Sequence, residues 1–164
     1  MKRLIALTLA GTLVAIAVAT ATPSTRTEEP QTMEKPLELG NFCICLAVED
    51  IKASKAFYEK FDFKEVSGKL EQNWIVLQNG STKIGLFQGM FEGNIMTFNP
   101  GWTSDGKPLE EFQDIREVQR VLKERGVTLT TEADRSTKGP ASFTTVDPDG
   151  NAILFDQHVP SPTR

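Results

Sequence analysis

Residues 41–63 change from a strand pattern to a helix pattern within one short stretch, NFCICLAVEDIKASKAFYEKFDF. Apolar side chains alternate along residues 42–48, which is the period of two expected of a β-strand. Asp50 follows at a position suited to a helix N-cap, where its carboxylate accepts from free backbone N–H groups. Residues 51–61 then carry apolar side chains at helical spacing. The stretch predicts a strand that leads directly into an amphipathic helix.

A second helix of the same kind begins at Asp114, where DIREVQRVLKERGV parallels DIKASKAFYEKFDF from Asp50. Each helix is preceded by one predicted strand and followed by three. The predicted strands are 42–48, 63–67, 74–77 and 83–88 around the first helix, and 94–98, 127–131, 141–146 and 151–156 around the second. The chain therefore predicts a two-fold internal repeat of β-α-β-β-β modules, about 41–89 and 93–157, and an α+β fold.

The first 21 residues have the pattern of a secretory signal peptide. Lys2 and Arg3 precede an apolar run over residues 4–18, and Ala19-Thr20-Ala21 forms an A-x-A cleavage signature. An uncleaved anchor is the alternative, because the apolar run is close to the minimum length of a membrane span. We expect a cleaved signal and an exported protein, periplasmic or secreted.

The remaining organisation is simple. Residues 22–39 carry three prolines among polar residues and predict a disordered linker. A single domain is expected over 40–158, with 159–164 as a tail. The net charge of −4 is spread over mixed acidic and basic residues without a basic stripe, which argues against a nucleic-acid partner. Contact with a membrane is expected only through an uncleaved signal.

The paired modules, the D-x-x-x-S-x-x-F-Y pattern from Asp50 and the D-P-D-G-N turn from Asp147 together resemble the vicinal oxygen chelate (VOC) superfamily. This superfamily includes glyoxalases, bleomycin-resistance proteins and extradiol dioxygenases, and the resemblance covers about residues 42–157. It implies that the two modules curl into a cup with the helices outside. The cup is either closed within one chain or formed by modules exchanged in a homodimer.

The resemblance also implies four metal-ligand positions in the cup, which fall on Cys43, Gly85, Asn94 and Leu154. None of these residues is the His, Gln or Glu of metal-dependent members, and Gly85 and Leu154 offer no side-chain donor. The divalent metals of the superfamily prefer imidazole and carboxylate ligands. We therefore expect no metal site and no cofactor.

Strand alternation from Cys43 predicts which side chains line the cup. The predicted ligand-binding residues are Cys43, Cys45, Phe87, Asn94, Met96, Trp102 and Asp156. Phe98 is expected on the same face, although residues such as Phe87, Met96 and Phe98 more often belong to an ordinary core. Such an apolar, partly aromatic lining with a few polar points suits a small organic molecule.

The leading hypothesis is an exported, metal-independent protein that binds a small hydrophobic or aromatic molecule for sequestration or sensing. One alternative is a metal-dependent lyase or dioxygenase with unusual ligands, for which Cys45, Asp156 and His158 form the available set. The other is a structural or interaction domain whose own side chains fill the cup. The sequence identifies no catalytic residue, because no cation adjacent in sequence would activate Cys43 or Cys45.

Overall fold

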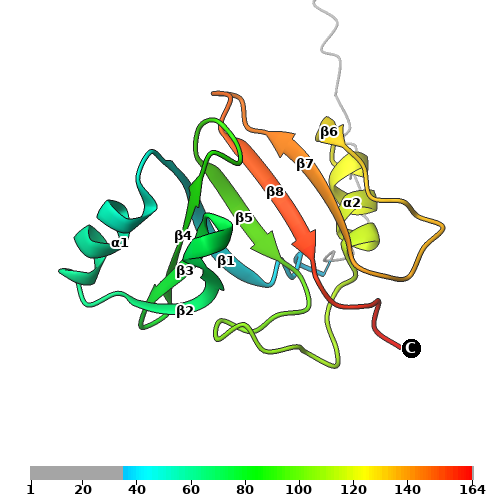
Figure 1. Cartoon of the computed structure of the whole chain (residues 1–164). Coiled ribbons are helices and arrows are strands. Elements are labelled where there is room, and N and C mark those ends of the chain that lie inside the picture. The colour runs from blue at the N-terminus through cyan, green and yellow to red at the C-terminus, as the bar shows by residue number, and fades with distance from the viewer. Residues whose placement is uncertain (1–34, 164) are drawn as a thin grey trace, which may run out of the picture. The chain divides into compact units, whose positions relative to one another are not determined.

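The structure, a computed structural model, describes residues 35–163 (Figure 1). The first module consists of β1 (Asn41–Val48), α1 (Ile51–Glu59), β2 (Lys64–Lys69), the 3-10 turn η1 (Leu70–Gln72), β3 (Trp74–Asn79) and β4 (Thr82–Gln88). The second consists of β5 (Ile95–Asn99), α2 (Ile115–Glu124), β6 (Leu129–Thr131), β7 (Ala141–Val146) and β8 (Ala152–Gln157). The predicted α+β fold with two β-α-β-β-β modules is confirmed. The predicted signal peptide, and the linker as far as residue 34, lie outside the described residues.

All the strands belong to one sheet, in the order β2-β3-β4-β1-β5-β8-β7-β6. Within each module the first strand runs parallel to the last, β1 beside β4 and β5 beside β8. The modules meet where β1 pairs antiparallel with β5, from Asn41 opposite Asn99 to Cys45 opposite Ile95. In this structure both modules of one chain join in a single continuous sheet.

The two helices begin where the sequence predicts. Asp50 Oδ1 accepts from the backbone N–H groups of Lys52 at 2.9 Å and of Ala53 at 3.0 Å. Asp114 Oδ1 accepts in the same way from the N–H of Arg116 at 2.9 Å. These bonds satisfy N–H groups that the first turn of a helix leaves without partners, and the carboxylates also suit the positive helix end.

Each helix covers its own hydrophobic core on one face of the sheet, and Figure 1 shows α1 and α2 against different modules. The core under α1 consists of Ile51, Ile75, Leu77, Ile84 and Leu86. The core under α2 consists of Ile115, Val118, Ala133, Phe143 and Phe155. Full burial of one such large side chain stabilises the fold by about 1.5–3 kcal/mol. With the helices on this face, the opposite face of the sheet is left to form the cup.

Neither helix described in residues 35–163 is long and apolar enough to cross a membrane.

Candidate functional site

A cavity of about 580 Å³ lies on the cup face of the sheet. Its walls come from β1, β2, β3, β4, β5 and β8, so both modules contribute to it. The loops after β4 and β5 add residues 90, 91, 102, 105 and 106 to its rim. The volume falls in the range of small-molecule binding sites.

One end of the cavity is aromatic. The rings of Trp74 and Phe87 stack with centroids 6.3 Å apart and an interplanar angle of 10°, because the two residues face each other across the β3–β4 ladder. Phe91 follows in the loop, with its ring 5.2 Å from that of Phe87. Ile95 completes this end from β5. A flat apolar group finds stacking partners here.

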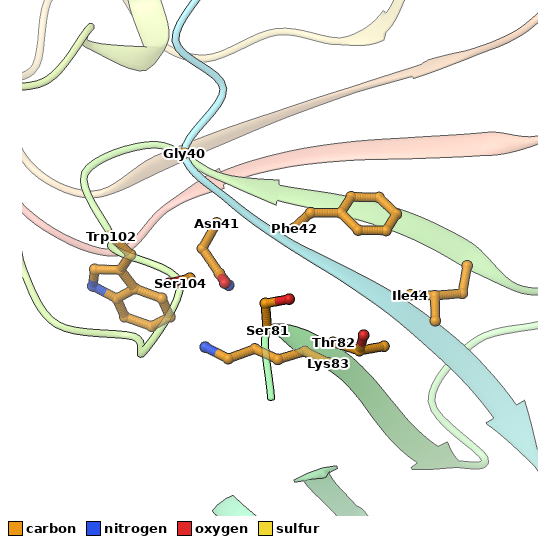
Figure 2. Close-up of a pocket in the computed structure, with 9 residues that line it drawn as sticks. All are labelled: Gly40, Asn41, Phe42, Ile44, Ser81, Thr82, Lys83, Trp102 and Ser104. Carbon is orange, nitrogen blue, oxygen red and sulfur yellow. The ribbon is translucent and has the colours of Figure 1, made fainter. Parts of the chain in front are cut away.

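The other end is polar. Asn41 and Asn99 face each other across the β1–β5 seam, and Asn41 Nδ2 donates to Asn99 Oδ1 at 3.3 Å. Asn99 Nδ2 in turn donates to the backbone carbonyl of Asp156 at 3.0 Å. Lys83 enters the same end from β4, and Figure 2 shows its side chain extending toward Asn41 and the loop that carries Trp102. The cavity is therefore amphipathic along its length.

Trp102 and His158 close the polar end. Their rings stack with centroids 4.4 Å apart at 15°, which fastens the loop after β5 to the residues after β8. His158 Nε2 lies 3.2 Å from Asp156 Oδ2. Burial raises the pKa of the Asp156 carboxyl, and the neighbouring His158 opposes part of that rise. His158 follows the last predicted strand, and its place in the sequence is typical of a solvated tail residue. In the structure it lines the cavity.

The two cysteines are buried on the cup floor as free thiols. Cys45 Sγ lies 3.3 Å from Thr97 Oγ1 on the neighbouring strand β5. Hydrogen bonding from Cys43, and then from Thr97, lowers the pKa of Cys45 to about 7. The same interaction with Cys45, together with burial, raises the pKa of Cys43. No cation adjacent in sequence takes part, as expected from the sequence; the partners that lower the pKa of Cys45 are Cys43 on the same strand face and Thr97 on β5.

Most predicted site residues line the cavity, namely Cys43, Cys45, Phe87, Trp102 and Asp156. Asn94 and Met96 do not, and their prediction as lining residues is wrong. Asn94 is exposed in the loop before β5, which begins one residue later. Because facing alternates along a strand, this offset turns Met96 to the helix face.

The same offset moves Phe98 out of the cup, where its ring stacks 5.3 Å from Phe155 in the core under α2. The cup-facing residues of β5 are Ile95, Thr97 and Asn99. The cavity is also lined by four residues outside the predicted set, namely Asn41, Trp74, Lys83 and His158. Correct placement of β5 would have identified Thr97 and Asn99, since they lie opposite Cys43 and Asn41.

The donor set of the cup does not fit a divalent metal. Gly85 lies opposite Cys45, and Leu154 opposite Thr97, and neither carries a donor atom. Among residues 35–163 no three His, Cys, Asp or Glu side chains are grouped so that they could hold a metal ion. The alternative ligand set of Cys45, Asp156 and His158 therefore does not form a site, although Asp156 and His158 pair with each other.

A cup built from two β-α-β-β-β modules, with its cavity between them, defines a VOC-type protein. The family profile described as Glyoxalase/Bleomycin resistance protein/Dioxygenase superfamily matches residues 42–155. The chain belongs to this superfamily.

Three solved structures are similar to the chain. A superfamily member from Vibrio splendidus 12B01 is 18% identical over 71% of this chain and 97% of that chain, with a TM-score of 0.49. A protein described as NAD-dependent benzaldehyde dehydrogenase from Legionella pneumophila is 15% identical over 71% and 98%, with a TM-score of 0.53. A hypothetical protein from Bacillus halodurans C-125 is 17% identical over 77% and 98%, with a TM-score of 0.50. At these identities the likeness to the two structures with TM-scores of 0.53 and 0.50 shows a shared fold only. A comparison with curated proteins finds no match.

Proposed function

We propose that this protein is exported and binds a small hydrophobic or aromatic molecule in the cup without a metal, acting in sequestration or sensing. The observation that carries the proposal is the amphipathic cavity of about 580 Å³ with the aromatic wall of Trp74, Phe87 and Phe91. Ligand sites are typically concave and apolar with a few polar groups that fix orientation. A cup of this volume also speaks against a domain that fills its cup with its own side chains.

The energetics favour an aromatic occupant. Burial of apolar surface contributes about 25 cal/mol per Å², and stacking on an aromatic pair adds about 0.5–1.5 kcal/mol. The polar end supplies groups that orient the ligand, whereas most of the binding free energy comes from the apolar contacts. Since Gly85 and Leu154 leave the implied ligand positions without donors, affinity must come from these contacts.

The two tryptophans of the chain, Trp74 and Trp102, both line the cavity and give a direct assay. The neutral dye N-phenyl-naphthylamine is titrated into the full chain, with tryptophan emission and dye emission recorded. We expect saturable one-to-one binding, unchanged by EDTA. Phe87→Ala should weaken dye binding, whereas Phe57→Ala, a matched change at an exposed ring on α1, should leave it unchanged. Absent saturation, or equal losses in both variants, would overturn the proposal.

Metal independence has its own test. Elemental analysis of protein purified without chelators should find no stoichiometric metal, and micromolar divalent metals should not raise the melting temperature. Stoichiometric metal, or such a rise, would retire this part of the proposal. It would redirect attention to Cys43, Cys45, Asp156 and His158 as ligands.

Export rests on the N-terminal sequence pattern alone. The full chain is expressed in a bacterium, and the N-terminus of the protein recovered from the periplasm and medium is sequenced. A mature chain that starts at Thr22 is the expected result. Recovery of the intact N-terminus in the membrane fraction would show that the segment stays as an anchor.

A further inference from the structure

Lys83 is the one charged residue that is buried among residues 35–163, with 7% of its surface exposed. No hydrogen bond or ion pair joins its ammonium to another described residue, and no fully buried side-chain nitrogen or oxygen there lacks a partner, so the stem of Lys83 is buried while the ammonium itself keeps some exposed surface. An ammonium at the edge of a largely buried site gains from an anionic or hydrogen-bonding partner. The ammonium nevertheless lies where a partner could reach it, because Lys83 lines the cavity.

The position of Lys83 is set by β4 and by the loop after β5. Its Nζ lies so near Gly106 that a Cβ added there would be 3.4 Å away. Lys83 also lines a second pocket, of about 610 Å³, which shares Asn41 and Trp102 with the cup (Figure 2). The ammonium therefore stands where the two hollows meet, at the polar end of the cup.

The other charged groups at this end are already paired. Asp156 Oδ2 lies 3.2 Å from His158 Nε2. Asp105 Oδ2 lies 3.5 Å from the ammonium of Lys107. Lys83 is thus left as an uncompensated positive charge at the polar end, and it faces a cavity whose far end is aromatic.

We propose that the ligand is a small amphipathic anion whose carboxylate, sulfonate or phosphonate oxygens bind Lys83. Its apolar body lies against Trp74, Phe87 and Phe91 at the other end. This inference rests on the proposed function of the cup and adds the charge and the orientation of the occupant. An anionic oxygen supplies a partner that no described residue gives this ammonium, and charge-assisted hydrogen bonds are the strong ones.

Two dyes that share the same aromatic rings but differ in charge distinguish the contribution of the charge to binding from that of the apolar contact. N-phenyl-naphthylamine is neutral, and anilinonaphthalene sulfonate adds a single sulfonate. Both are titrated into the wild-type chain, into Lys83→Met, and into the control Lys52→Met, which removes an exposed lysine from α1. Displacement of the neutral dye by the sulfonate confirms that the two share a site.

We expect Lys83→Met to weaken sulfonate binding by about tenfold to hundredfold, the loss typical of one hydrogen bond to a charged group. Binding of the neutral dye should stay unchanged, which also shows that the variant is folded. Lys52→Met should affect neither dye. Lys83→Gln, which keeps a polar side chain, serves as the second variant if Lys83→Met does not fold.

Equal affinity of the sulfonate for the wild type and for the folded Lys83 variants overturns this inference while leaving the proposed function standing. Failure of both dyes to bind the wild type overturns the proposed function and the inference with it. A neutral dye that loses as much affinity as the sulfonate assigns Lys83 to packing and also overturns the inference.

Discussion

The backbone N–H of Ile115, the first residue of α2, donates a 2.8 Å hydrogen bond to Oε1 of Gln157 at the end of β8. The first module repeats this bond, since the N–H of Ile51 donates to Oε1 of Gln88 at 3.0 Å. In each module the last strand therefore ends at the start of the helix. The glutamine side-chain oxygen accepts a hydrogen bond from a backbone N–H that the first helical turn leaves without a partner. This shared contact marks the internal repeat more directly than the apolar pattern does.

Replacing Gln157 should destabilise the fold more than replacing Gln88. Gln157 is fully buried and also donates to the carbonyl of Val159 at 3.0 Å, so Gln157→Ala leaves buried groups without partners. We expect its free energy of unfolding to fall by about 1–3 kcal/mol, measured by urea denaturation. Gln88→Ala should cost less, because Gln88 is half-buried and water can reach its site. Equal losses would show that the two contacts are not graded by burial.

Cys45 should be the reactive thiol of the cup. Because Cys43 and Thr97 lower the pKa of Cys45 to about 7, its alkylation by iodoacetamide should accelerate through neutral pH. Cys43→Ala removes the first of these donors and should move the midpoint upward, toward the ordinary value of 9.0. Mass spectrometry of the alkylated peptide follows both rates.

Cys45→Ala is the matched control for this reaction. Its remaining thiol, Cys43, should react slowly at neutral pH in the buried site. A wild-type midpoint near 9, or an unchanged midpoint in Cys43→Ala, would contradict the assigned interaction.

Asp156 should make the protein less stable as the pH rises above the ordinary carboxyl value of 3.8. Burial raises the pKa of Asp156, so the folded state holds this proton more tightly than the unfolded state does. Stability from the protonated carboxyl is therefore lost as the pH climbs from 3.8 through the raised pKa. Asp156→Asn removes this loss, so its melting temperature relative to wild type should increase over that window and then level off. A constant or falling difference would contradict this.

Gly85 should be needed to keep the cup open. A Cβ added at this position would lie 2.6 Å from Cε2 of Phe87 and 3.3 Å from Sγ of Cys45. Gly85→Ala should therefore displace the Phe87 ring, weaken dye binding and cost about 1–3 kcal/mol of stability as overpacking. Gly139→Ala is the control, because no atom lies within 4 Å of its added Cβ. Unchanged dye binding in Gly85→Ala would show that the ring moves freely.

The sequence predicts the fold well because the fold is encoded locally. Each signal depends only on neighbouring residues. The signals are the alternation along β1, the N-caps at Asp50 and Asp114, and the Asn79-Gly80 turn between β3 and β4. Repetition of the pattern then supplies the module architecture. These signals required no knowledge of which strands pair.

The site was predicted less completely because its composition depends on register and on distant loops. A one-residue error at the start of β5 exchanged Thr97 for Met96 on the cup face. Lys83 follows a tight turn and resembles an exposed lysine until the loop at Gly106 is placed over it. The stack of Trp102 on His158 joins segments for which no sequence pattern predicts contact.

The seam between β1 and β5 has a thermodynamic consequence. Each half of the domain packs its own core under its own helix, whereas the cavity takes Phe87 from one half and Asp156 from the other. A molecule bound in the cavity would pack against both halves and so add apolar contacts across the seam. If the cup binds a ligand as proposed, its occupancy links the unfolding of the two halves, and the midpoint of heat denaturation rises with ligand concentration.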